Sequence, residues 1–95
     1  MNEVIPYTHL TVSQVIHTKK CKFYGIIVTP DGTNAGYVDI YDGENAVEPL
    51  FMRVRCLGTV SVSVILQAPA LLQRGLYISL ACTGVLVTVF SEAVE

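Results

Sequence analysis

The segment from residue 75 to residue 90 most constrains the fold of this chain, because it carries no charge and is apolar on both sides of two predicted strands. The predicted strands are Gly75–Cys82 and Val85–Phe90, joined in a hairpin at Cys82-Thr83-Gly84. An antiparallel strand with one solvated face should alternate apolar and polar side chains. Few side chains here are polar enough to face water, so we expect the second face of the hairpin to contact another subunit or a partner.

The composition of the chain supports this expectation. Of its 95 residues, 52% are hydrophobic and 15% are charged, and the mean hydropathy is +0.52. A chain of this length forms one domain with a small interior, and ordinary domains are about 25% charged. The apolar side chains exceed what so small a core accommodates, which favours burial in an oligomer or against a partner.

Length, charge and cysteine content argue against several classes of protein. The uncharged run at 75–90 is shorter than the ~20 apolar residues of a membrane-spanning helix, and its β-branched residues favour strands. The first ten residues lack the pattern of a signal peptide. A net charge of −2 gives no long-range attraction to nucleic acid, and three cysteines without a signal peptide indicate reduced thiols in a protein made in the cytoplasm. We therefore expect neither a membrane nor a nucleic-acid partner.

Short strand patterns separated by turn signals recur along the chain. Such a succession predicts an all-β, single-domain antiparallel β-sandwich, or a small barrel, of about seven to eight strands. Residues 1–8 lack periodicity and contain Pro6, so we expect an extended N-terminal arm there, followed by the sandwich domain over residues 9–95. The predicted strands are Leu10–Ile16, Lys22–Thr29, Gly36–Asp42, Leu50–Cys56, Thr59–Leu66, Gly75–Cys82 and Val85–Phe90.

Three local patterns refine this picture. Val60–Val64 alternates valine with serine, which predicts valines inward and serines outward. Because this segment is uncharged, we expect it to be paired on both sides. Pro69–Arg74 is a candidate for a single helical turn. Asp-Gly pairs begin at Asp31 and Asp42, and the strand between them should place the two turns at opposite ends of the sheet.

Candidates for catalysis or metal binding are sparse. His9, His17 and Cys21 lack the paired spacing of a zinc site. The acidic turn from Asp39 to Asn45 does not have the ligand spacing of a calcium loop. No glycine-flanked nucleophile and no recognisable pair of catalytic acids occurs in the sequence. We expect no catalytic residues, no metal and no cofactor, and a protein that is not an enzyme.

Two clusters of cations are candidate contact sites. Lys19, Lys20 and Lys22 precede two aromatic residues and could bind a strand of nucleic acid; we favour a charged loop that keeps the end of the sheet soluble. Arg53 and Arg55 share one face of their predicted strand. Such a pair meets carboxylates across a sheet or a subunit boundary, and the candidate carboxylates are Asp39 and Glu48.

Four segments of the sequence carry a resemblance: Gly25-Ile-Ile-Val28, Gly36-Tyr-Val-Asp-Ile-Tyr-Asp-Gly43, Gly75-Leu-Tyr-Ile78, and Thr83-Gly84 leading into Val87-Thr-Val89. In this succession the chain resembles small all-β virion structural proteins of tailed bacteriophages, including capsid decoration or cement proteins, over roughly residues 21–90. The resemblance implies a jelly-roll-like sandwich that forms a trimer seated on a capsid shell, without catalytic residues.

On this resemblance, we expect a decoration or cement subunit that forms a homotrimer, binds the major capsid protein and stabilises the phage head shell. It would be made in the cytoplasm of the bacterial host and located on the capsid surface of the virion. Binding only the assembled shell stabilises that shell by mass action. The expected oligomer interface comprises Tyr77, Ser79, Ala81, Leu86, Thr88, Phe90, Arg53 and Arg55, and the expected partner-facing loops contain Lys19, Lys20, Asp31, Asn34, Asp42 and Asn45.

Two alternatives stay open. The first is a structural protein of the head–tail junction or the tail fibre, which the number of copies per virion would distinguish from a decoration protein. The second is a small ligand-binding or carbohydrate-binding β-sandwich, in which Tyr24, Tyr37 and Tyr41 form a stacking platform. Tyrosines also suit an ordinary protein interface, so these three residues do not decide between the classes.

Overall fold

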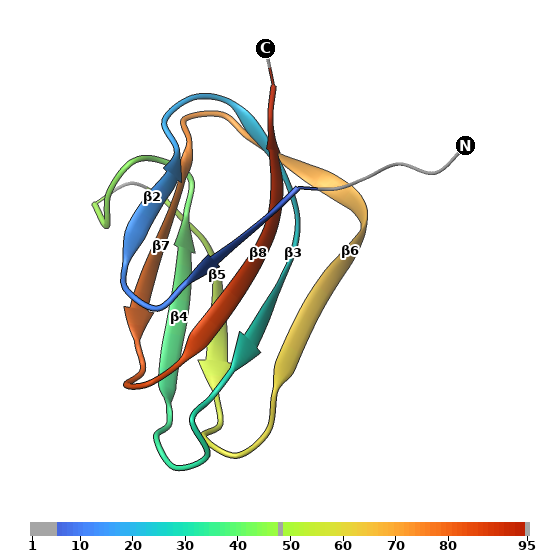
Figure 1. Ribbon diagram of the computed structural model, residues 1–95. Coiled ribbons are helices and arrows are strands. Elements are labelled where there is room, and N and C mark those ends of the chain that lie inside the picture. Colours follow the sequence, from blue (N-terminus) through green and yellow to red (C-terminus); the bar gives the residue numbers. More distant parts are fainter. Residues whose placement is uncertain (1–5, 48, 95) are drawn as a thin grey trace.

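The computed structural model describes residues 6–47 and 49–94, which form eight strands in two antiparallel four-stranded sheets (Figure 1). One sheet has the strand order β1-β8-β3-β6 and the other β2-β7-β4-β5. This all-β sandwich has the strand order of a jelly roll and confirms the predicted fold class. The strands are β1 (Tyr7–Leu10), β2 (Gln14–His17), β3 (Cys21–Thr29), β4 (Gly36–Tyr41), β5 (Leu50–Cys56), β6 (Val62–Leu72), β7 (Leu76–Ala81) and β8 (Leu86–Ala93).

The connections between strands carry the chain back and forth between the two sheets. Among the described strands, only β4 and β5 are neighbours both in the sequence and in a sheet. The strands β7 and β8 lie in different sheets, so the predicted hairpin at Cys82-Thr83-Gly84 is wrong. This turn, with Gly84 at a φ of 73°, instead crosses from one sheet to the other. The alternation of a strand predicts its faces but not the strand with which it pairs.

The core lies between the sheets and follows the predicted alternation. Leu76 and Ile78 of β7 and Val87 and Val89 of β8 are fully buried. Along β6, Val62 and Val64 of the Val-Ser repeat pack against this core and Ser63 between them is exposed, as the sequence predicts. The strand begins at Val62 and not at Thr59, and Val60, which we also expected to point inward, is 57% exposed. The side chains that the sequence places on the second face of β7 and β8 therefore point away from the core, onto the outer faces of the sandwich.

The N-terminal region differs from the prediction in two ways. The single predicted strand Leu10–Ile16 is two strands, because the chain leaves one sheet after Leu10 and enters the other at Gln14. In addition, Tyr7 and Thr8 belong to β1 and pair with β8, so the sandwich begins before residue 9. Residues 1–5 of the predicted arm lie outside the described residues.

The strand β6 also differs from the prediction. It continues through Pro69 to Leu72, so the predicted helical turn is wrong for residues 69–72. Proline is tolerated because β6 is an edge strand, where one row of backbone groups needs no partner within the sheet. Among the described strands, β6 pairs with β3 alone, and not on both sides as we expected.

The two Asp-Gly turns lie at opposite ends of the sandwich, as predicted, because β4 separates them. In the β3–β4 connection, Asp31 Oδ1 accepts the backbone N–H groups of Thr33 and Asn34, each at 2.9 Å. These hydrogen bonds lower the pKa of Asp31 to about 2. At the other end, Asp42 Oδ1 accepts the backbone N–H of Arg74 at 2.9 Å.

Candidate functional site: two outer faces

The outer face of the sheet β2-β7-β4-β5 carries charged and aromatic side chains, and we call it the Tyr–Arg face. Its members alternate with core residues along β4, β5 and β7, so all of them point to the same side of the sheet. The residues of the Tyr–Arg face are Tyr37, Asp39, Tyr41, Arg53, Arg55, Tyr77, Ser79 and Ala81.

An ion pair lies at the centre of the Tyr–Arg face. Asp39 and Arg53 are direct partners across β4 and β5, and Arg53 donates from Nε to Oδ1 at 2.7 Å and from Nη2 to Oδ2 at 3.2 Å. Asp39 is 8% exposed, and its carboxylate raises the pKa of Arg53. The predicted pairing of Arg53 with Asp39 is confirmed, whereas Glu48, the other candidate, lies outside the described residues.

The tyrosines of this face contact their neighbours. The guanidinium of Arg53 lies 4.6 Å from the ring centre of Tyr37, a cation–π distance, and that of Arg55 lies at 5.8 Å. Tyr41 and Tyr77 have ring centres 6.1 Å apart. Tyr24 belongs to the other sheet, where its hydroxyl donates to Glu92 Oε1 at 2.7 Å. The structure therefore does not bring Tyr24 together with the other two members of the predicted stacking platform.

The outer face of the sheet β1-β8-β3-β6 is different in character, and we call it the apolar face. The strand registers place its side chains in two rows that each cross all four strands. Leu86 lies beyond these rows on β8. The first row is Tyr7, Phe90, Gly25 and Ile65, and the second is His9, Thr88, Ile27 and Ser63.

Side chains of the apolar face leave a large apolar area in solvent. Tyr7 is 63% exposed, Ile65 61% and Leu86 38%. Gly25 has no side chain, and the position its Cβ would occupy is 2.7 Å from Cδ1 of Ile65. Ile65 therefore covers the gap that the glycine leaves in the first row, which makes the middle of this face continuous.

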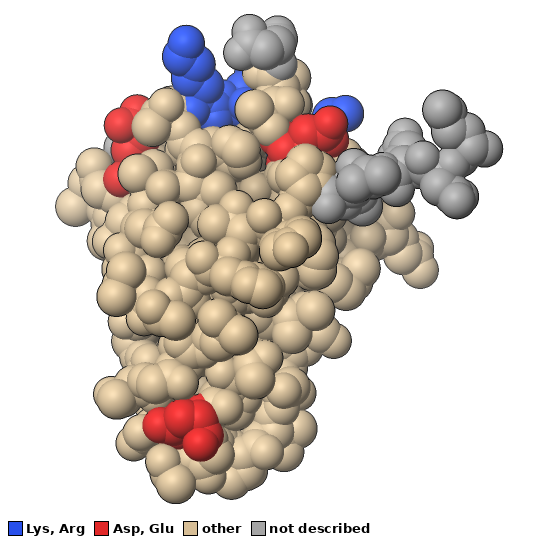
Figure 2. Space-filling view, viewed as in Figure 1, with Lys and Arg blue, Asp and Glu red and all other residues tan. Residues whose placement is uncertain are grey.

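Charged residues lie at the two ends of the molecule and not between them on the view in Figure 2. Lys22 and Glu92, which are register partners, mark one end of the apolar face. The β6 edge of the apolar face carries no charged residue, because residues 56–73 of the sequence contain none. An apolar area bounded by charged ends is the kind of surface that marks a protein interface.

The predicted oligomer interface does not form one patch. Tyr77, Ser79 and Ala81 lie on the Tyr–Arg face together with the two arginines, Arg53 and Arg55. The remaining three residues lie on the apolar face, on the opposite side of the sandwich, because β7 and β8 belong to different sheets. These three residues are Leu86, Thr88 and Phe90.

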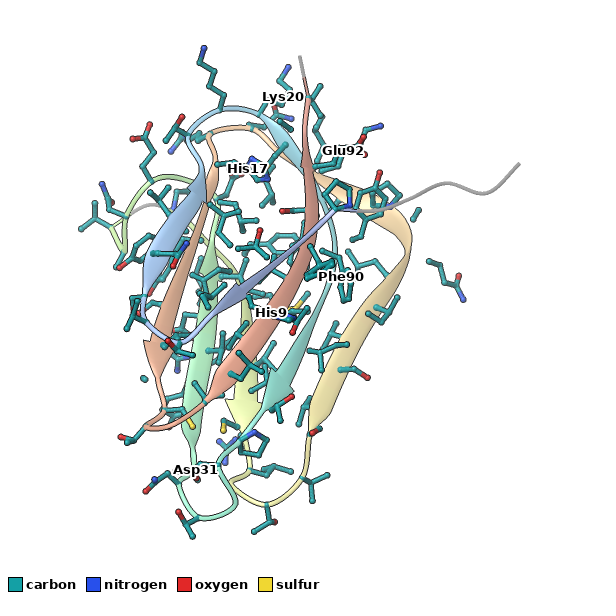
Figure 3. All side chains as sticks on the ribbon, in the orientation of Figure 1. His9, His17, Lys20, Asp31, Phe90 and Glu92 are labelled. Atoms are coloured by element: carbon teal, nitrogen blue, oxygen red, sulfur yellow. The ribbon has the colours of Figure 1, made fainter. Side chains whose placement is uncertain are left out.

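The predicted partner-facing loops also lie at two separate ends. Lys19 and Lys20 precede β3, and Asp42 and Asn45 follow β4, so these four residues lie at one end. Asp31 and Asn34 lie between β3 and β4, at the other end. Figure 3 shows this separation, with Lys20 and Asp31 labelled at opposite ends of the molecule.

Three residues of the apolar face, Tyr7, Ile27 and Ile65, were not predicted as site residues. For Ile65, the sequence carries a signal, because the alternation that turns Ser61 and Ser63 outward turns Ile65 outward as well. For Tyr7 and Ile27, the register of four strands distant in the sequence is needed, and no local pattern gives it.

His17 and Ser91 have side chains of types that occur in catalytic sites, and here they contact each other between the two sheets. His17 Nε2 on β2 lies 3.0 Å from Ser91 Oγ on β8, and Ser91 is 4% exposed. Burial lowers the pKa of His17 below its usual value. A hollow of about 230 Å³ adjoins His17 and is also lined by Lys19 and Lys20. Within residues 6–47 and 49–94, no three His, Cys, Asp or Glu side chains are placed to hold a metal ion.

Comparison of the chain with protein-family models, with curated proteins and with solved structures finds no match in any of the three. Across the described residues, no helix is long and apolar enough to cross a membrane.

Proposed function

We propose that this protein is a non-enzymatic structural subunit that self-associates through its apolar face and acts as a decoration or cement subunit of a tailed-bacteriophage capsid. The observation that carries this proposal is the apolar face itself. It presents Tyr7 and Ile65 at 63% and 61% exposure, and charge is confined to the ends of the molecule in this view. Leaving such an area in water is unfavourable, and covering it with a second copy removes that cost.

The size of the molecule fits this role. Its accessible surface is 5622 Å², so the roughly 800 Å² that each partner contributes to a stable interface would take about one seventh of it. Covering a Leu, Ile or Phe side chain contributes about 1.5–3 kcal/mol relative to full exposure, and the partly exposed side chains here contribute a fraction of that each. Several such side chains together are needed to hold copies of the chain in an oligomer.

The capsid role is supported by the fold and by the resemblance of residues 21–90 to small virion structural proteins. Jelly rolls occur in viral capsid proteins, and also in lectins and cupins, so the fold is compatible with the role without selecting it. In the proposed arrangement the apolar face joins copies of this chain, preferably as a trimer, and a charged end of the sandwich contacts the major capsid protein. The end with Lys19, Lys20 and Asp42 offers charges of both signs for that contact.

The first experiment measures the solution mass by light scattering over a concentration series. We expect an oligomer for the wild-type chain and a monomer for Ile65→Lys, which places a charge in the first row of the apolar face. The matched control is Val47→Lys, because Val47 is 89% exposed and lies between β4 and β5, away from this face. A wild-type chain that stays monomeric at every concentration contradicts self-association.

The capsid role is tested separately by sedimentation of the purified chain with purified heads of a tailed phage. A decoration protein should pellet with the heads in numbers comparable to those of the shell subunits, and a junction protein in only a few copies per particle. An oligomer that never pellets with heads would retain the assembly role and contradict the capsid role.

A carbohydrate-binding module is the second candidate, favoured by one observation on the Tyr–Arg face. Tyr37 is 39% exposed, and with Arg55 it lines a hollow of about 480 Å³. An aromatic ring beside hydrogen-bond donors suits a sugar ring. Titration with oligosaccharides, followed by tyrosine fluorescence, would detect this function, and Tyr37→Ala should abolish the signal.

A further inference from the structure

Two cysteines from different strands lie against each other at the Asp31 end of the sandwich. Cys56 ends β5 and Cys82 follows β7, and their Sγ atoms are 2.7 Å apart. Figure 3 shows two sulfur atoms close together near that end. A disulfide bond is about 2.05 Å long, so the two sulfur atoms need to approach by only about 0.65 Å to become bonded.

Gly36 explains how two cysteines from non-adjacent strands meet. The strand β4 lies between β5 and β7, and Gly36 at its start is the register partner of Cys56. A Cβ on Gly36 would lie 2.0 Å from the carbonyl oxygen of Ala81 and 3.0 Å from the Cα of Cys82. The glycine thus lets the end of β7 approach β4 closely, which brings Cys82 within reach of Cys56.

The surroundings hold both thiols in place. The backbone carbonyl oxygen of Asn34 lies 3.5 Å from Cys82 Sγ and 3.8 Å from Cys56 Sγ. Asn34 is itself fixed by Asp31, which accepts its backbone N–H at 2.9 Å and its side-chain amide at 2.7 Å. The loop therefore places one hydrogen-bond acceptor beside both thiols. The two cysteines are thus already positioned next to each other in the reduced protein.

We propose that Cys56 and Cys82 are a dithiol pair that a small-molecule disulfide, such as glutathione disulfide, converts to an intramolecular disulfide joining β5 to β7 across β4. A small-molecule disulfide can reach the half-buried Cys82, whereas Cys56 is 1% exposed and lies at the edge of the hollow of about 480 Å³ beside Tyr37 and Arg55.

The reaction balances in two exchange steps. The Cys82 thiolate attacks one sulfur of glutathione disulfide, whose S–S bond breaks and releases one glutathione. The Cys56 thiolate then attacks the Cys82 sulfur of this mixed disulfide and releases the second glutathione. The two protein thiols lose two electrons and two protons in total, and glutathione disulfide takes them up to become two glutathione thiols.

The raised pKa of Cys82 slows its reaction with an oxidant. Burial, followed by the hydrogen bond to Cys56, raises the pKa of Cys82 to about 11, and the Asp31 carboxylate contributes in the same direction. Little thiolate is therefore present at neutral pH, and the exchange should be slow compared with that of an exposed cysteine. Cys21 lies at the start of β3, at the opposite end of the sandwich, and is fully buried.

The test incubates the folded chain with glutathione disulfide, removes the glutathione and measures the intact mass. We expect a loss of two hydrogen atoms in the wild-type chain and in Cys21→Ala, and no such loss in Cys56→Ala or Cys82→Ala. Trypsin makes the assignment direct, because cleavage after Arg55 and Arg74 places Cys56 in peptide 56–74 and Cys82 in peptide 75–95. The two peptides should remain joined until a reductant is added.

Thermal unfolding provides a second readout that needs no variant. The disulfide would close a loop of 26 residues between Cys56 and Cys82, which should raise the Tm of the oxidised wild-type chain by at least about 5 °C over the reduced chain. The proposal is overturned if all three thiols stay titratable after equilibration, if the bond involves Cys21, or if it forms only after the chain is unfolded in denaturant.

Discussion

The two outer faces of this sandwich differ in the contacts that their outward-pointing side chains make within the chain. On the Tyr–Arg face, neighbouring strands supply partners to one another, as Asp39 does for Arg53 and Tyr41 for Tyr77. On the apolar face, a row across four strands joins Tyr7, Phe90 and Ile65 around a glycine, and apolar area stays exposed. Along β7 and β8, the alternation within each strand predicts apolar side chains on both faces. Whether the side chains of an outer face find contacts within the chain depends on the neighbouring strands of the same sheet.

The largest effect should come from filling the gap in the apolar face. A Cβ at Gly25 would lie 2.6 Å from the backbone oxygen of Val64, so Gly25→Val should lower the free energy of unfolding by about 2 kcal/mol through overpacking. Chemical denaturation measures this change. Thr88→Val, on the same face, is the control and should stay within about 0.5 kcal/mol of the wild type. Equal stability of the Gly25 variant would mean that the row is not closely packed.

A smaller effect is expected on the Tyr–Arg face. Arg53→Gln removes the charge partner of the nearly buried Asp39, and since the Arg53 side chain is 53% exposed, solvent screening keeps the loss in unfolding free energy small. Arg55→Gln is the matched control on the same strand and should cost less. A larger cost for Arg55 than for Arg53 would show that the ion pair does not hold this face together.

The contact between His17 and Ser91 lies between the two sheets and away from both outer faces, so a change at His17 should affect folding and not association. Burial puts the pKa of His17 in the folded chain below 6.5, so the unfolded chain binds the proton more readily. The stability associated with neutral His17 should be complete above pH 6.5 and should fall as the pH drops through the lower folded pKa. Denaturation curves between about pH 8 and pH 5 measure this. His17→Gln should flatten the profile, and an unchanged profile would contradict the assignment.

The smallest expected effect concerns salt. If the apolar face is the interface, raising the salt concentration from about 0.1 to 1 M, which shortens the Debye length from about 10 to 3 Å, should leave association unchanged or slightly stronger. Light scattering at each salt concentration measures the association. Dissociation at high salt would instead place the interface on the charged Tyr–Arg face.

The sequence predicts the local features of the fold well because they depend on neighbouring residues. The alternation along β7 and β8 predicts the buried set, the Val-Ser repeat predicts the inward face of β6, and the separation of the two Asp-Gly turns follows from the length of one strand. The pairing of Arg53 with Asp39 could also be anticipated, since both lie on outward positions of consecutive strands.

The features that were not predicted depend on residues far apart in the sequence. The turn at Cys82-Thr83-Gly84 has the composition of a hairpin, but the partners of β8 are β1 and β3. The contact between Cys56 and Cys82 requires β4 to lie between β5 and β7 with a glycine at its start, and a spacing between cysteines carries no such information. Pro69 predicts the end of a strand unless the strand is known to lie at the edge of a sheet.

The strand order has a consequence for how the chain is made. The sheet β1-β8-β3-β6 takes one strand from near the start of the sequence and places β8 between it and β3. While the chain is being synthesised, β1 has no partner in this sheet until β8 has left the ribosome. The first row of the apolar face, from Tyr7 through Phe90 to Ile65, is therefore assembled last. A nascent chain on a polysome therefore lacks that surface, and the self-association proposed for the apolar face would have to wait until each subunit is folded.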